Sequence, residues 1–470
     1  MRGVPGLAAV IHPVYGEQAY EGAIIHGAAR AAGDTEKLMR VRSVSAGLGL
    51  AASLVPLTAV LAQRVDPIAP LPASPVASVP PAATPDAPAV APPVVLPPAV
   101  WRASDVAQLA AYIGTVGREG LDPADYDPAG LDAAVRSGNP VAWSAAATER
   151  FNKLSSDLAL GHVRGDARVG WHIVDKDLDD ARQRELLDKS LATRTMTETL
   201  NALLPTHPQY GALRYALEVT PKTETAKLNR IRLNMDRWRW LPRDLGQKYI
   251  IVNVPSFHAT LVENGVTRWK RKAIAGAIKT PTPQLSVMAT GVILNPSWEV
   301  PKSIWPEVAG KPGYVRIKDK NGKFVRWSQP AGPSNALGQL KFVMYNPYNI
   351  YLHDTNARSR FNSQVRALSH GCVRTENVLD LATELLGDDG GEWTKEKIAE
   401  TLASKKSKQA NFVKPVPVYI VYFSAAALTD GTITDYQDLY KRDTKVIAAL
   451  LDRDGKPAAT AAGAAKKTAR

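Results

Sequence analysis

Residues 369–374 of the chain are Ser-His-Gly-Cys-Val-Arg, and they include Cys372, the only cysteine among 470 residues. The N-terminal segment described below indicates export, and exported proteins normally use cysteine in disulfide pairs, so a single thiol suggests a reactive group. Free cysteine is also among the most buried residue types, and an inert core position is the alternative. His370 and Gly371 beside it, and a further histidine at position 353, favour the reactive interpretation.

A nucleophilic thiol needs a base, and the oxyanion that its attack creates needs hydrogen-bond donors. His353, in Tyr351-Leu352-His353-Asp354-Thr355, is predicted to lie on a strand and to act as the base. The backbone N–H groups of Gly371 and Cys372 are predicted to hold the oxyanion. A zinc site made of Cys372, His353 and His370 would also be chemically sound, because three N/S ligands and a water form a catalytic pattern. We predict no metal.

The sequence around this stretch is mostly that of a β domain. Strands are predicted at 249–254, 259–263, 269–278, 291–294, 341–345, 350–353 and 416–423. Asn264-Gly265 predicts a hairpin turn, and a helix is predicted at 378–386, directly after the cysteine. Residues 301–340 are rich in Gly, Pro, Lys and Trp without a regular pattern, which is typical of a lid or binding loop.

Upstream of this domain the apolar residues recur at helical spacing. One such face lies within 106–116, and another helix is predicted from Glu224 to Met235. We interpret this part as a small all-helical domain that has no catalytic constellation of its own. The predicted parts from residue 101 onward are a helical domain at 101–243, a catalytic domain at 244–425 and a C-terminal extension with a basic, disordered tail at 426–470.

The first 100 residues are typical of targeting and tethering segments. Arg40 and Arg42 precede an uncharged, apolar run that ends in small residues, as in a secretory signal peptide. An uncleaved membrane anchor is the alternative, since about 20 apolar residues can span a bilayer. We therefore predict a mis-called leader at 1–38, a signal peptide or anchor at 39–62 and a semi-rigid Pro/Ala-rich linker at 63–100.

The chain is basic, with a net charge of +13 and a pI near 9.6. A positively charged surface favours binding to a polyanion, for example nucleic acid, anionic lipid headgroups or an acidic cell wall. No zinc-finger, RNP-like or basic-zipper pattern is present, and we predict no nucleic-acid partner. A hydrophobic content of 45% is enough for a sizeable core.

Ser-His-Gly-Cys with a histidine some fifteen to twenty residues upstream resembles the active-site signature of the L,D-transpeptidases, whose YkuD-like catalytic domain remodels peptidoglycan. Segments 276–283, 295–301 and 332–342 resemble further parts of that domain. Residues 119–126, Gly161-His162-Val163 and 234–242 resemble the helical scaffold of the large periplasmic branch in Gram-negative bacteria. The resemblance covers about 101–425 and includes no separate peptidoglycan-binding module.

The resemblance implies an α+β fold: a sandwich-like, mostly β catalytic domain with a flanking helix and a capping region at about 301–340, after an all-α scaffold domain. It implies that Cys372 is the nucleophile and that His353, oriented by the backbone of Asp354, is the base. Gly371, and in part His370, would stabilise the oxyanion. Arg374 is expected to bind a substrate carboxylate, although pairing with Glu376 is the alternative. Further candidates for substrate contact are Asp354, Ser369, Trp298 and Tyr351.

The resulting expectation is a periplasmic enzyme that forms 3–3 cross-links between peptidoglycan stem peptides through a cysteine thioester. It would be exported, or tethered to the inner membrane, and we expect a monomer without a cofactor. An L,D-carboxypeptidase, or an enzyme that links lipoproteins to peptidoglycan or releases them, would use the same residues with another acceptor. An inactive wall-binding module is the alternative of another class.

Overall fold

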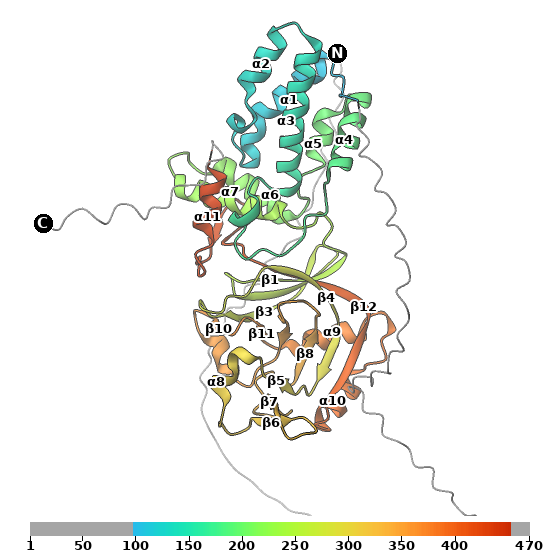
Figure 1. The fold of residues 1–470 in the computed structure, drawn as a ribbon, viewed down its shortest axis with the longest axis vertical. Coiled ribbons are helices and arrows are strands. Elements are labelled where there is room, and N and C mark those ends of the chain that lie inside the picture. Colours follow the sequence, from blue (N-terminus) through green and yellow to red (C-terminus); the bar gives the residue numbers. More distant parts are fainter. Residues whose placement is uncertain (1–96, 453–470) are drawn as a thin grey trace, which may run out of the picture. The chain divides into compact units, whose positions relative to one another are not determined.

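The computed structural model describes residues 97–452, and Figure 1 shows helices followed by a mostly β part. The α-helices are α1 (Ala103–Thr115), α2 (Pro128–Arg136), α3 (Pro140–Leu160), α4 (Asp180–Thr193), α5 (Met196–Asn201), α6 (Pro208–Val219), α7 (Thr225–Arg239), α8 (Trp305–Val308), α9 (Val378–Gly387), α10 (Lys395–Ala403) and α11 (Asp443–Leu450). Within the described residues no helix is both long and apolar enough to cross a membrane. The predicted leader, the signal or anchor segment, most of the linker and the basic tail lie outside these residues.

Local sequence signals set the ends of the helices. Asn139 caps α3, because its Oδ1 accepts the Val141 N–H at 3.0 Å, and Pro140 fills the first helical position. Helix α3 ends at Gly161, whose φ is +85° and where a Cβ would lie only 2.5 Å from the Trp240 ring. A helical region preceding a mostly β domain is thereby confirmed, with α1 to α7 complete before the first strand begins.

The strands are β1 (Lys248–Asn253), β2 (His258–Glu263), β3 (Val266–Gly276), β4 (Leu285–Leu294), β5 (Trp298–Glu299), β6 (Val315–Lys318), β7 (Phe324–Gln329), β8 (Leu340–Val343), β9 (Leu352–His353), β10 (Ala367–Ser369), β11 (Val373–Thr375), β12 (Lys408–Val421), β13 (Ala425–Ala427) and β14 (Ile433–Asp435). Nine of them form one sheet in the order β10-β3-β11-β9-β8-β4-β12-β1-β2. Strand β2 pairs again with β3, so the sheet closes on itself. The predicted hairpin at Asn264-Gly265 joins these two strands, with positive φ at both residues.

The closed sheet differs from the sandwich-like layers that we expected. Two long strands make the closure: β3 pairs first with β2 and then with β11 and β10, and β12 joins β4 to β1. The alternation of apolar residues in one strand predicts its buried face but not its partners, so closure was not visible in the sequence. The enclosed core includes the fully buried side chains of Ile250, Val292, Leu352 and Ile420.

The capping region is more regular than the loop predicted for 301–340. Strands β5, β7 and β6 form a separate three-stranded sheet, and α8 lies beside it (Figure 1). Val300, Ile304 and Val308 form its own small buried cluster, against which Trp298 and Trp305 pack. Strands of two to six residues are too short to show a clear period in a sequence this rich in Gly, Pro and Lys.

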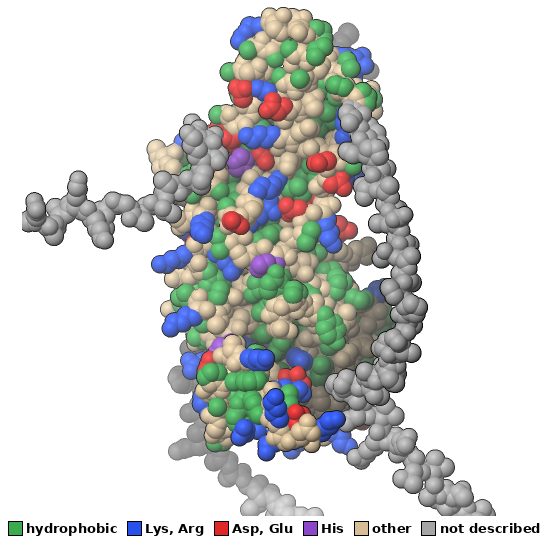
Figure 2. Space-filling view, viewed as in Figure 1, with side chains coloured by type: hydrophobic (Ala, Val, Ile, Leu, Met, Phe, Trp, Pro, Cys, Tyr) green, Lys and Arg blue, Asp and Glu red, His purple; other side chains and the backbone are tan. Residues whose placement is uncertain are grey.

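Positive side chains are spread over both parts of the described chain. On the face shown in Figure 2, Lys and Arg lie among Asp and Glu over the helices, and several gather near the end that holds β6, β7 and α10. The capping region itself contains seven Lys and Arg residues: Lys302, Lys311, Arg316, Lys318, Lys320, Lys323 and Arg326.

The residues after β12 pack against the helical part of the chain. Val446 and Leu450 of α11 share a buried cluster with Leu233 and Trp240, at α7 and its end. Arg237 of α7 and Asp443 of α11 form an ion pair at 2.8 Å, with side chains only 2% and 8% exposed. The C-terminal extension is therefore, up to residue 452, a folded part of the structure.

Candidate functional site

A cavity of about 710 Å³ contains Cys372 and lies between the large sheet and the capping region. The capping side contributes Trp298, Pro301 and Trp305, from β5 to α8. The sheet side contributes residues of β8, β9 and β11 and of the turn before β11. The cavity thus joins the two regions that the sequence assigned to chemistry and to capping.

The strand register places five functional groups on one face of the sheet. Strands β9 and β11 are parallel, with His353 opposite Arg374, and β8 is antiparallel to β9, with Lys341 opposite the same His353. Alternate residues of a strand share a face, so Tyr351 and Cys372 point to the same side. All five line the cavity. Two residues predicted from distant parts of the sequence, His353 and Cys372, are therefore brought to one site.

The turn before β11 is held by its own backbone and by Ser369. Gly371 has φ of +114°, a conformation that residues with a side chain rarely adopt. Its N–H donates to Ser369 Oγ at 3.1 Å, and Ser369 Oγ donates to the Cys372 carbonyl at 2.5 Å. The Gly371 amide, predicted to hold the oxyanion, is thus engaged within the turn. Of the two amides predicted for this role, the Cys372 amide therefore remains as the candidate donor.

The Cys372 thiol is held in a neutral form. Its Sγ donates to the Asn349 carbonyl at 3.4 Å, and the Tyr351 hydroxyl also contacts it. Burial raises the pKa of the thiol, while Tyr351, Lys341 and Arg374 act in the opposite direction. The thiol therefore resembles a protonated nucleophile that needs a base rather than a preformed thiolate.

His353 is neutral as well. Its side chain is buried, and burial, then the cation of Arg374, lower its pKa to about 3; Lys341 adds to this, and the Asp354 backbone opposes it. Its Nδ1 is buried and has no hydrogen-bond partner within residues 97–452. The imidazole is therefore unprotonated at neutral pH, so that a ring nitrogen is free for the thiol proton during attack.

Asp354 points away from this cavity. Its Oδ2 accepts the Gln339 N–H at 2.9 Å and pairs with Arg358 at 2.9 Å, and the residue is not among those lining the cavity. A Cβ at Gly338 would lie 2.4 Å from the same oxygen, so the carboxylate is closely enclosed. The carboxylate thus has structural partners, and the backbone of Asp354 is what acts on His353.

On the sheet side of the cavity two cations, Arg374 and Lys341, have no ion-pair partner among the described residues. The Arg374 Nε is buried without a hydrogen bond, and burial lowers the pKa of this guanidinium. Glu376, the alternative partner, instead accepts from the Lys272 N–H. Lys341 was not predicted as a site residue. Lys341 reaches the cavity because β8 pairs with β9 and β9 pairs with β11. The register of these pairings cannot be read from one sequence.

The remaining predicted residues connect the site to the capping region. His370 is exposed, and its Nε2 lies 3.0 Å from Glu307 Oε1 of α8. Trp298 lines the cavity and contacts the hydroxyl of Tyr351, whose pKa is raised by burial and by Cys372. Tyr351 therefore lies between the thiol and the capping region.

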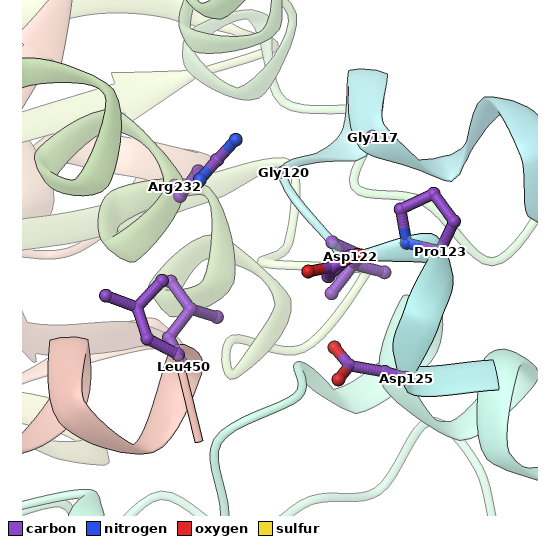
Figure 3. A pocket seen from close by; sticks show the side chains of 9 residues that line it. Gly117, Gly120, Asp122, Pro123, Asp125, Arg232 and Leu450 are labelled. Atoms are coloured by element: carbon purple, nitrogen blue, oxygen red, sulfur yellow. The ribbon is translucent and has the colours of Figure 1, made fainter. Parts of the chain in front are cut away.

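Other parts of the described chain offer fewer reactive groups. Between residues 97 and 452 no cluster of three His, Cys, Asp or Glu side chains could hold a metal ion. A second cavity, of about 430 Å³, lies in the helical part, with Asp122, Asp125 and Arg232 on its wall (Figure 3). Its lining contains neither histidine nor cysteine, unlike that of the cavity around Cys372.

Comparison with known families gives two matches. Residues 247–418 match the YkuD family, described as the L,D-transpeptidase catalytic domain. Residues 98–217 match a family described as the scaffold domain.

Individual relatives are similar over part of the chain. A Haemophilus influenzae protein provisionally named an L,D-transpeptidase is 32% identical over 251 residues, which are 48% of this chain and 50% of that protein. The chain thus spans about half the length of this curated relative. An L,D-transpeptidase structure from Mycobacterium smegmatis is 14% identical over 37% of this chain and 58% of its own, with a TM-score of 0.19. The catalytic domain of an Enterococcus faecium L,D-transpeptidase acylated by ertapenem is 14% identical over 38% and 99%, also with a TM-score of 0.19.

Proposed function

We propose that this chain is a peptidoglycan L,D-transpeptidase that forms 3–3 cross-links through a thioester on Cys372. The proposal is supported by the match of residues 247–418 to the YkuD L,D-transpeptidase catalytic domain and of residues 98–217 to the scaffold domain. One observation carries the proposal. A neutral thiol and a neutral imidazole share one sheet face with two unpaired cations in the same cavity.

The first step is attack by Cys372 on the carbonyl between a diamino acid and D-alanine of the donor stem. The thiol turns from the Asn349 carbonyl, sulfur forms the new C–S bond, and His353 takes the proton. Because Arg374 and Lys341 disfavour an imidazolium beside them, proton transfer accompanies attack and does not precede it. His353 then returns the proton to the amine of the departing D-alanine, which leaves the thioester.

The negative charge of the intermediate develops on the former carbonyl oxygen. We assign the Cys372 N–H as the hydrogen-bond donor to this oxygen, because the Gly371 N–H already donates to Ser369. Loss of one such donor typically lowers kcat by about 10²–10³-fold, so the orientation of this amide matters for the rate.

Arg374 and Lys341 supply recognition of the donor. A stem peptide is anionic near the scissile bond, and a partly buried guanidinium without an internal partner suits a bidentate carboxylate. Lys341, on the other side of His353, offers a second point charge. The two cations also favour the thiolate as it forms, so they serve both binding and chemistry.

The second step is attack on the thioester by an amine of a neighbouring stem. His353 removes a proton from that amine, the C–S bond breaks, and the thiol is restored with a new amide in the cross-link. Water in place of the amine would give a shortened stem, which is carboxypeptidase activity. We propose that the protein acts in the periplasm, where this substrate lies, and the cations of the capping region suit an acidic wall.

Incubation of the full chain with disaccharide-tetrapeptide, followed by mass spectrometry, tests this function. We expect a dimer from the wild type and no product from Cys372→Ala. A tripeptide alone would indicate a carboxypeptidase, and an unchanged substrate would indicate an inactive wall-binding module. A carbapenem should add its mass to the wild type only, and an adduct that persisted in Cys372→Ala would refute the assignment of the nucleophile.

A further inference from the structure

Thr282 lies in the loop between β3 and β4 and is completely buried. Its hydroxyl accepts the Gly276 N–H at 2.8 Å and donates to the Gly371 carbonyl at 2.7 Å. A hydroxyl has a single proton to donate, and here the acceptor is the Gly371 carbonyl in the turn before β11, called the catalytic turn below. Thr282 thus links this loop directly to the residue before Cys372.

Peptide geometry makes this link relevant to the chemistry. The Gly371 carbonyl and the Cys372 N–H belong to one planar, trans peptide and point in opposite directions. Gly371 has no side chain to restrict its backbone, so the hydrogen bond from Thr282 defines the plane of this peptide. Holding the carbonyl toward Thr282 directs the N–H to the other side.

The loop is itself held by the C-terminal segment 436–443. The Tyr440 hydroxyl donates to the Gly276 carbonyl at 2.6 Å and accepts the Thr282 N–H at 3.3 Å. Arg442 donates to the Thr282 carbonyl at 3.1 Å. These two side chains lie beyond residue 418, where the match to the catalytic-domain family ends.

The segment 436–443 is in turn fixed by two carboxylates. Asp438 Oδ1 accepts the Arg442 N–H at 2.9 Å, which closes the segment on itself. Asp443 pairs with Arg237 of α7 at 2.8 Å, although the two groups are not aligned for a hydrogen bond. A continuous series of contacts therefore leads from α7 to the turn before β11.

We propose that Thr282 is a positioning residue for acyl transfer: supported by Tyr440, its hydroxyl orients the Gly371–Cys372 peptide so that the Cys372 N–H donates to the oxyanion. The inference rests on the proposed function, because an oxyanion forms only if Cys372 attacks a carbonyl. Thr282 acts through the backbone of the turn and does not touch the substrate.

The test compares Thr282→Val, which keeps the shape of the side chain, with Thr282→Ser, which keeps the hydroxyl, in the full chain. Acylation of Cys372 by a carbapenem creates an oxyanion, whereas alkylation by iodoacetamide does not. We expect Thr282→Val to slow acylation at least about tenfold, within the ~10³-fold limit for losing the oxyanion donor itself. Alkylation should stay within about twofold, and Thr282→Ser should restore acylation.

Thr220→Val is the matched control. Thr220 is buried at the end of α6, and its hydroxyl donates to the Ala216 carbonyl at 2.6 Å, remote in the fold from the catalytic turn. The same chemical change there should lower the melting temperature without slowing acylation. A slowing equal to that of Thr282→Val would show that lost stability alone explains the effect, and would overturn the inference.

Two further outcomes would overturn it: unchanged acylation in Thr282→Val, or an equal loss of acylation and alkylation. If this variant does not fold, Tyr440→Phe carries the same test, because it removes the hydroxyl that supports Gly276 and Thr282. It should slow acylation severalfold with alkylation unchanged, and full acylation in it would overturn the inference. A wild type that reacts with iodoacetamide but is never acylated would refute the proposed function instead.

Discussion

Acid should destabilise the folded protein through His353, because folding holds its imidazole neutral. Burial, then Arg374 and Lys341, lower its pKa to about 3, against an ordinary value of about 6.5 in the unfolded chain. Since the unfolded state binds the proton first, this contribution to stability is intact above pH ~6.5 and is lost as the pH falls toward ~3. At about 1.4 kcal/mol for each pH unit, a fall from pH ~6.5 to ~4.5 removes about 3 kcal/mol.

Urea unfolding at pH 7.0 and at pH 4.5 measures this effect in the wild type and in His353→Gln. The variant has no imidazole to charge, so it should lose about 3 kcal/mol less than the wild type between the two conditions. His353 is only 4% exposed, so solvent screening does not reduce the expected difference. His207→Gln is a positive control, because burial also lowers the pKa of His207, to about 4. Equal losses in the wild type and His353→Gln would refute the idea that folding keeps the proposed base neutral.

Three further predictions concern the cation Lys341, the turn at Gly371 and the ion pair between Arg237 and Asp443. Lys341→Met should shift the pH dependence of Cys372 alkylation upward, because a cation that favours the thiolate is lost; an unshifted profile would contradict this. Gly371→Ala forces a side chain onto φ of +114° and should slow carbapenem acylation at least ~10²-fold, and acylation at the wild-type rate would show that the turn tolerates another geometry. Arg237→Met leaves Asp443 buried without its partner and should cost about 3–5 kcal/mol in urea unfolding, and a loss below ~1 kcal/mol would mean that this pair anchors little.

The sequence was most informative where chemistry depends on residue type. A lone cysteine, a glycine before it and a histidine upstream predicted the composition of the site, and the structure brings Cys372 and His353 into one cavity. Helical spacing likewise located the helical region, because apolar residues at intervals of three and four mark a buried face without any knowledge of the partner.

What depends on pairing between distant strands was not predictable. Lys341 joins the site only because β8 pairs with β9 in a register that sets it opposite His353. The Gly371 amide was assigned to the oxyanion because the sequence does not show that Ser369 Oγ accepts its N–H. The link from Tyr440 to Thr282 spans more than 150 residues, and no local pattern signals it.

The closed sheet also affects when, during synthesis and folding, the site around Cys372 can form. Strand β1 pairs with β12 in parallel, with Ile250 opposite Val418, so the sheet closes only after nearly all of the domain has been synthesised. Contacts between residues so far apart in the chain form slowly during folding. Cys372, inside this loop of chain, would therefore emerge as an ordinary, accessible thiol and become part of a shielded reactive centre only in the last stage of folding.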